Sequence, residues 1–121
     1  MLRTLIIIYL ILCNLLTGPT DHRVTVYGPE CGNVTATGHV IDWKAVAEGR
    51  EFTAAVSPVA ERLYPLNSVI YVSGRGFYTV RDRTARWLDS IYPEGTVDLA
   101  SHEHFCEQQG VWLIWKPEDG R

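Results

Sequence analysis

The stretch Val69 to Val80 constrains the fold most, because it has the sequence signature of a tight β-hairpin. Two β-branched and aromatic runs, Val69 to Val72 and Phe77 to Val80, are separated by Ser73-Gly74-Arg75-Gly76. Glycine adopts the positive φ angles that tight turns require, so the two runs are expected to pair as antiparallel neighbours. Because side chains alternate between the faces of a strand, the residues expected on the inner face are Ile70, Val72, Tyr78 and Val80.

The rest of the chain is expected to form short strands with little helix between them. Strands are predicted at Arg23 to Tyr27, Val34 to Ala36, Phe52 to Val56, Val97 to Ala100 and Val111 to Lys116. Short helical segments are predicted at Asp42 to Gly49, Val59 to Tyr64 and Ser101 to Gly110. Because strands and helices do not alternate regularly, the pattern predicts a mainly β fold, a six-stranded barrel with one or two short helices, rather than a doubly wound sheet.

Residues 1–20 are interpreted as a secretory leader. Arg3 supplies one positive charge, and an apolar run follows from Leu5 to Leu12. This run is shorter than the roughly 20 residues that cross a membrane, so a signal peptide cleaved between Thr17 and Asp21 is favoured over an uncleaved anchor. We therefore expect an exported protein, either periplasmic, wall-associated or secreted, in which residues 21–121 form one domain and only an uncleaved leader would contact a membrane.

The distribution of charge argues against a nucleic-acid partner. All 14 acidic residues lie beyond the leader, whereas one of the 11 basic residues, Arg3, lies within it, so residues 21–121 carry 10 basic and 14 acidic side chains. A negative domain with scattered basic residues is poorly suited to contact many phosphates. We expect no nucleic-acid partner, and we expect a monomer.

Two cysteines, Cys31 and Cys106, lie beyond the leader. In an exported domain an even pair predicts one disulfide, which would close a loop over most of the domain and stabilise it by a few kcal/mol. The alternative is a pair of buried free thiols. Because export is expected, we predict the Cys31–Cys106 bridge.

Several short motifs, taken in order, resemble the 3D domain family. They are TAAVSP at Thr53 to Pro58, YPLNSVIYVSGRGFYTVRDRT at Tyr64 to Thr84, and VDLA at Val97 to Ala100. That family, named for three aspartates, is related to the double-psi β-barrel lytic transglycosylases and more distantly to expansin-like and barwin-like proteins. The likeness covers about Val24 to Lys116 and implies a double-psi barrel.

Two of the three family aspartates have counterparts in this chain. Asp82 follows the hairpin and Asp98 lies in the later strand, whereas Ser57 stands where the first aspartate would fall. Asn67 stands where glycine is common, and the loop between the two aspartates is longer than usual. The resemblance implies a peptidoglycan lytic transglycosylase, in which an aspartic acid protonates the bond between N-acetylmuramic acid and N-acetylglucosamine and the muramyl 6-hydroxyl attacks to give a 1,6-anhydro product.

The general acid must hold its proton near the working pH, so its pKa must be raised by apolar surroundings or by a nearby carboxylate. Asp98 lies between Val97 and Leu99 and suits this role. Asp82 lies between two arginines and is expected to stay ionised and assist. The alternative for both is a structural aspartate that accepts backbone N–H bonds. Asp89, in the following loop, is a second-carboxylate candidate or a solvated residue.

Aromatic and basic residues in the same loop are candidate substrate contacts. Trp87 and Tyr92 can present flat apolar faces to a sugar, and Arg83 and Arg86 can pair with a lactyl or peptide carboxylate. Alternatively, the rings cover the barrel and the arginines form an exposed charged edge. Trp112 and Trp115, in the last strand, are expected in the core.

No metal or other cofactor is predicted, because His102 and His104 diverge on a helix and no metal-binding motif follows them. Ser57 in place of an aspartate also suits a non-catalytic glycan-binding or wall-loosening module. A secreted or phage-borne interaction domain is the third class considered.

Overall fold

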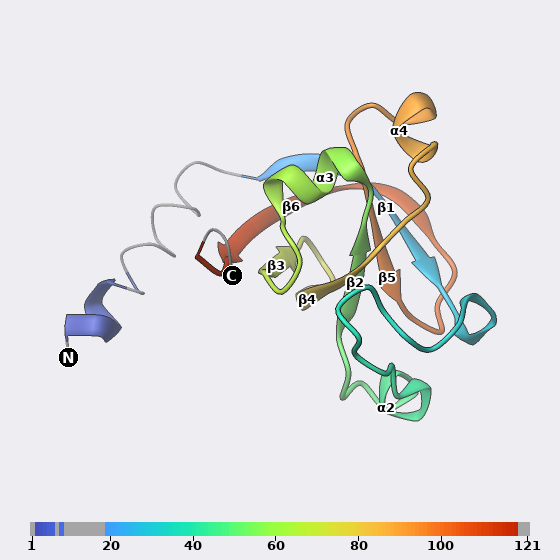
Figure 1. The fold of residues 1–121 in the computed structure, drawn as a ribbon, viewed down its shortest axis with the longest axis horizontal. Coiled ribbons are helices and arrows are strands. Elements are labelled where there is room, and N and C mark those ends of the chain that lie inside the picture. The colour runs from blue at the N-terminus through green and yellow to red at the C-terminus, as the bar shows by residue number, and fades with distance from the viewer. Residues whose placement is uncertain (1, 7, 9–18, 119–121) are drawn as a thin grey trace.

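The computed structural model describes residues 2–6, 8 and 19–118. The elements follow one another as β1 (Thr20–Tyr27), η1 (Pro29–Cys31), α2 (Trp43–Ala47), β2 (Thr53–Val56), α3 (Pro58–Leu63), β3 (Val69–Val72), β4 (Gly76–Arg83), α4 (Leu88–Ile91), β5 (Thr96–Ala100) and β6 (Cys106–Trp115). The six strands form a closed barrel in the order β1-β5-β2-β4-β3-β6 (Figure 1). The predicted mainly β, six-stranded barrel is confirmed, and its helices are all short.

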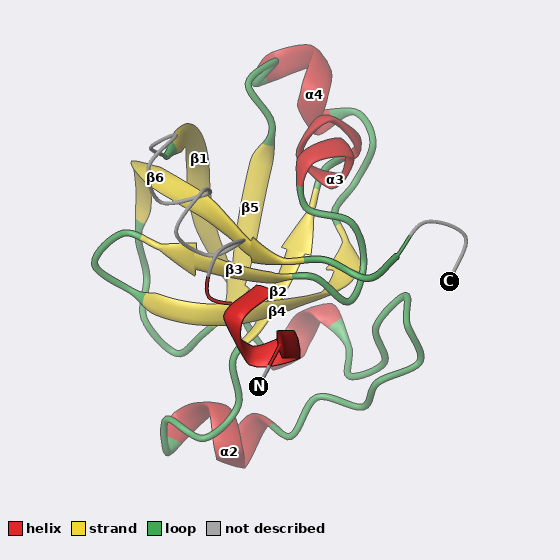
Figure 2. Cartoon of the chain, turned by 90° about the vertical axis from the view of Figure 1, so that its left-hand side faces the viewer, coloured by secondary structure: helices red, strands yellow, loops and turns green. Residues whose placement is uncertain are grey.

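Two pairs of neighbouring strands run parallel, β1 with β5 and β2 with β4. The other four pairings are antiparallel, including the predicted hairpin of β3 and β4. Gly74 and Gly76 in the hairpin turn adopt φ angles of 75° and 112°, as the turn prediction requires. Helices α3 and α4 lie at one end of the barrel and α2 at the other (Figures 1 and 2).

The core fills the barrel with the inward side chains of every strand. The hairpin contributes the four residues expected there, with Ile70, Val72 and Val80 fully buried and Tyr78 9% exposed. On β5, Val97 and Leu99 are fully buried. The residue between them, Asp98, therefore projects from the outer face of the barrel, because successive side chains of a strand alternate.

A β-bulge interrupts the pairing of β2 and β4. Ala54 lies opposite Val80 and Ala55 lies opposite Asp82, so Arg81 is the extra residue on β4. Bulges redirect side chains and are frequent near functional sites. Here the bulge allows the consecutive residues Arg81 and Asp82 to line two different pockets outside the core.

Three local predictions are wrong. The segment Ser101–Gly110 is not a helix, because β6 begins at Cys106 and pairs with β1 on one side and β3 on the other. Ladder hydrogen bonds on both edges outweigh the local capping signals. Around Val34 there is only a single bridge to Val40, and Trp115 is 49% exposed at the end of β6 rather than in the core.

The predicted disulfide is also wrong, since Cys31 and Cys106 are both free and exposed. Cys106 lies opposite Thr25, on the side of β1 that pairs with β6. Cys31 follows β1 and lines a pocket with Asp98 of β5, the strand on the other side of β1. Both thiols are therefore left unpaired.

Most of the predicted leader lies outside the described residues. Strand β1 already begins at Thr20, the last residue of that predicted segment. Among the residues with described structure, no helix combines the length and the apolar character needed to span a membrane.

Candidate functional site

The two aspartates singled out by the sequence flank one small residue of β2. Ala55 pairs with Asp82 of β4 on one side and with Asp98 of β5 on the other. Residues at paired positions share a face of the sheet, and neighbouring strands are about 4.8 Å apart, so the two Cα atoms are about 10 Å apart. Both aspartates line one pocket of about 260 Å³, whose floor includes the methyl-sized side chain of Ala55.

Asp98 is half-buried in this pocket, and its Oδ1 accepts a 2.7 Å hydrogen bond from Thr25 Oγ1. Burial raises the pKa of the Asp98 carboxyl to about 6, and the charge of Asp82 adds to the rise, whereas Thr25 and Arg23 oppose it. Burial disfavours the ionised carboxylate because it removes water from the charge. The Asp98 carboxyl therefore stays protonated at higher pH than an ordinary aspartic acid, into the mildly acidic range.

Asp82 is held by backbone donors. Its Oδ1 accepts hydrogen bonds from the N–H of Ala36 at 3.0 Å and of Arg83 at 2.8 Å. The flanking arginine side chains are directed elsewhere: Arg83 binds Glu61 in a bidentate pair at 2.8 and 3.0 Å. Arg81 donates to Thr53 Oγ1 at 2.7 Å. The carboxylate is thus oriented by the main chain rather than by the arginines that sequence reasoning invoked.

Tyr27 is the pocket residue that sequence reasoning missed. Its hydroxyl is buried and has no hydrogen-bond partner among the described residues. Burial raises the pKa of Tyr27, and the charges of Asp82 and Asp98 raise it further. The alternation in RVTVY indicates that Thr25 and Tyr27 share the outer face, but the sequence does not reveal the parallel register that brings Thr25 opposite Asp98.

The other predicted substrate contacts are only partly brought to this pocket. Arg83 lines it, and Arg86 lines an adjoining pocket of about 450 Å³ that also includes Arg83. Trp87 is 62% exposed, and its neighbour Leu88, not Trp87 itself, lines the carboxylate pocket. Tyr92 lies outside it, with the Arg23 guanidinium 3.9 Å above its ring.

Ser57 and Asp89 have structural positions outside the carboxylate pocket. Ser57 is fully buried, and its Oγ accepts a 2.9 Å hydrogen bond from the N–H of Thr96, which links β2 to β5. Asp89 is half-buried, and its Oδ2 accepts from the N–H of Val59 at 2.9 Å in the first turn of α3. Neither of the alternatives for Asp89, a second catalytic carboxylate or a solvated residue, fits this position.

Within residues 2–6, 8 and 19–118, no group of three or more His, Cys, Asp or Glu side chains could hold a metal ion. Comparison with known proteins gives no match, whether with protein-family models, curated proteins or solved structures. Function therefore has to be inferred from the geometry of the pocket, and the family resemblance of the sequence motifs stays a prediction.

Proposed function

We propose that this chain is an exported peptidoglycan-active protein, a small lytic transglycosylase that cleaves the bond between N-acetylmuramic acid and N-acetylglucosamine. The observation that carries the proposal is the position of Asp82 and Asp98 on either side of Ala55, in one pocket, with the pKa of Asp98 raised to about 6. Two carboxyl groups in one pocket, one of them with a raised pKa, are the arrangement that many enzymes use to cleave glycosidic bonds.

In the proposed reaction, protonated Asp98 donates its proton to the glycosidic oxygen as the bond to the muramyl C1 breaks. Positive charge develops on C1 and its ring oxygen, and the Asp82 carboxylate stabilises that charge. The muramyl 6-hydroxyl then attacks C1 and passes its proton to the Asp98 carboxylate. The acid is restored, the 1,6-anhydro ring is closed, and no water is consumed.

The adjoining pocket with Arg83 and Arg86 would take the acidic part of the substrate. Arg83 is already paired with Glu61, whereas the ion pairs among the described residues do not include Arg86. A free guanidinium is suited to bind a lactyl or peptide carboxylate. Trp87 and Tyr92 stay candidate contacts for sugars beyond the carboxylate pocket.

The test is to incubate the full chain with peptidoglycan and measure 1,6-anhydromuropeptides by mass spectrometry. We expect products from the wild type, their loss by about 10³-fold in Asp98→Asn, and a smaller loss in Asp82→Asn. Asp89→Asn is the matched control, because its amide oxygen can still accept from the N–H of Val59 outside the pocket. Products that persist in Asp98→Asn would exclude this residue as the acid.

A non-catalytic glycan-binding module is the second candidate, favoured by the buried structural position of Ser57 where the resembled family has an aspartate. It predicts that the wild type and Asp98→Asn sediment equally with peptidoglycan and that neither releases anhydro products. Failure of both to sediment would favour the third class, an interaction domain.

A further inference from the structure

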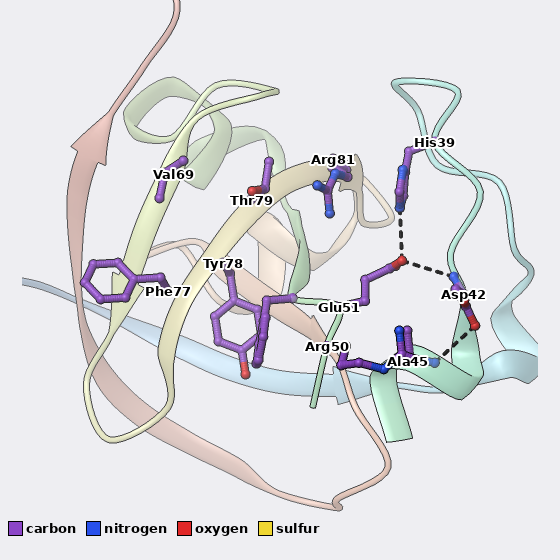
Figure 3. A pocket seen from close by; sticks show the side chains of 11 residues that line it. His39, Asp42, Ala45, Arg50, Glu51, Val69, Phe77, Tyr78, Thr79 and Arg81 are labelled. Carbon is purple, nitrogen blue, oxygen red and sulfur yellow. Dashed lines mark hydrogen bonds and ion pairs between the residues drawn. The ribbon is translucent and has the colours of Figure 1, made fainter. Parts of the chain in front are cut away.

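A second pocket, of about 370 Å³, lies outside the carboxylate pocket and has no part in the proposed cleavage step (Figure 3). Its volume is in the range of small-molecule sites. It is bordered by β4, the segment that precedes β2 and the loop of residues 33–42. Arg81 lines this pocket and the next residue, Asp82, lines the carboxylate pocket, because the bulge at Arg81 turns both residues outward.

The polar wall of this pocket is fixed before any ligand arrives. The Glu51 side chain is 10% exposed, and its Oε1 accepts from the N–H of Asp42 at 3.1 Å. Its Oε2 accepts from Thr53 Oγ1 at 3.2 Å, and the same Oγ1 accepts from Arg81 Nη1 at 2.7 Å. A donor and an acceptor are thus held in one network, which lowers the entropy cost of binding.

His39 extends the polar wall of this pocket. Figure 3 shows His39 directed from the 33–42 loop toward Glu51, and Nε2 lies 3.2 Å from Glu51 Oε1. That distance fits an ion pair, but the groups are not aligned for a hydrogen bond, and this buried nitrogen has no hydrogen-bond partner among the described residues. The pairing holds the His39 ring, whose side chain is 34% exposed, beside Glu51 at the edge of the pocket, where it can contact a ligand.

The opposite wall of the pocket is aromatic. Phe52 and Phe77 are 44% and 58% exposed, although both are large apolar side chains. Phe52 packs edge to face against Tyr78, with ring centroids 5.7 Å apart. Accessible rings beside a fixed set of polar groups suit a ligand that has both flat apolar faces and hydroxyl or amide groups.

We propose that this pocket is a second binding site that takes one neutral N-acetylhexosamine residue of a glycan. A sugar ring offers an apolar face to Phe52 and hydrogen-bonding groups to His39, Glu51 and Arg81. The pocket lining holds two carboxylates, Asp42 and Glu51, and two guanidinium groups, Arg50 and Arg81, so it has no excess positive charge to favour an anion. A neutral sugar can donate its hydroxyl groups to Glu51. The choice of glycan rests on the proposed function, because consecutive β4 residues serve the two pockets and one strand of peptidoglycan would occupy both.

The experiment titrates the ¹⁵N-labelled full chain, in an Asp98→Asn background that blocks cleavage, with a tetramer of N-acetylglucosamine. We expect saturable amide shifts at His39, Glu51 and Phe52. Glu51→Gln and Phe52→Ala should each weaken binding about tenfold. Leu63→Ala, which removes a similarly exposed apolar side chain outside this pocket, should leave the affinity unchanged. The spectrum of each variant also shows whether it is folded.

Shifts confined to the carboxylate pocket, or no saturable shift at all, would overturn the second site. Equal weakening by Leu63→Ala and Phe52→Ala would do the same. The result is independent of cleavage: a wild type that releases no anhydro product but still binds the tetramer here contradicts the transglycosylase and supports this site. A wild type that releases anhydro products but does not bind the tetramer in this pocket supports the transglycosylase and contradicts the second site.

Discussion

Two polar clusters in this barrel use their hydrogen-bonding capacity in opposite ways. In the first, His22 of β1 is fully buried, its Nδ1 is 2.8 Å from the carbonyl oxygen of Glu94 and its Nε2 is 2.8 Å from the Tyr64 hydroxyl. A neutral imidazole has one donor and one acceptor, so these two partners satisfy it completely. The first cluster, His22, Tyr64 and Glu94, is closed.

The second cluster, Asp82, Asp98 and Tyr27, is open. Among the described residues, the hydrogen bonds to both carboxylates go to Oδ1 alone, and the Tyr27 hydroxyl has no partner. Burial lowers the pKa of His22 and raises the pKa of Asp98, so it favours the neutral form in both clusters. The difference lies in what the neutral groups can still bind, and it separates residues that stabilise the fold from residues that can receive a ligand.

Replacing His22 should give the largest loss of stability. His22→Ala leaves a cavity, unpairs the Glu94 carbonyl and removes the 2.8 Å partner of the Tyr64 hydroxyl, which keeps only its 3.3 Å hydrogen bond to the Val111 carbonyl. The free energy of unfolding should therefore fall by about 3 kcal/mol. Urea unfolding measures the change. Tyr64→Phe, which removes the hydrogen bonds to His22 and Val111 but keeps the ring and leaves no cavity, should lose only about 1 to 2 kcal/mol. A loss in His22→Ala as small as that in Tyr64→Phe would mean that the closed cluster does not hold the barrel together.

Asp98→Asn should instead stabilise the protein at neutral pH. The pKa of Asp98 is about 6 in the folded chain and 3.8 ordinarily, so between these values the folded state binds more protons than the unfolded state. The free energy of unfolding of the wild type therefore decreases as pH rises through this window. Asparagine removes the effect, and the gain should be about 2 kcal/mol at pH 7 after allowance for partial exposure.

Urea unfolding of wild type and Asp98→Asn at pH 3 and pH 7 tests the sign. The two proteins should be nearly equal at pH 3, where both side chains are neutral, and diverge at pH 7. A difference in the free energy of unfolding that does not change with pH would show that burial does not raise the pKa of Asp98.

Tyr27→Phe should separate stability from function in the open cluster. Removing a buried hydroxyl without a partner should leave the free energy of unfolding within about 0.5 kcal/mol of the wild type, or raise it. If the hydroxyl binds substrate, release of anhydro products should fall about tenfold. Tyr71→Phe, outside the pocket, is the control for both measurements. A stability loss with unchanged product release would assign Tyr27 to the fold instead.

The sequence predicts well those features that depend on neighbouring residues. The β3–β4 hairpin follows from its glycines, and α2 begins where Asp42 accepts from the N–H of Ala45 at 3.1 Å, as an N-cap residue should. Asn67, where the resembled family often has glycine, has a φ of 73°. Asparagine tolerates this left-handed conformation, so the departure from the family pattern is conservative.

The features that were wrong or missed depend on pairing between distant segments. The capping signals at Ser101 to Gly110 predicted a helix, but the second half of this segment belongs to the ten-residue strand β6, which has partners on both sides. Thr25 and Tyr27 join the Asp98 pocket only through the parallel pairing of β1 and β5, and no local pattern encodes that register. Cys31 and Cys106 are both free, so an even count of cysteines was not enough to predict a bridge.

The cysteines allow the finest test of the two-cluster comparison, because one lies at the open pocket. Cys31 lines the pocket of Asp82 and Asp98, whereas Cys106 is exposed elsewhere at the start of β6. Without reductant, both should react with iodoacetamide, and peptide mapping resolves each site. In an Asp98→Asn background, soluble peptidoglycan fragments should slow alkylation of Cys31 a few-fold, because a bound glycan restricts access to the pocket, and should leave Cys106 unaffected. Thiols that react only after reduction would restore the disulfide, and equal rates with and without fragments would mean that the open cluster is not where the glycan binds.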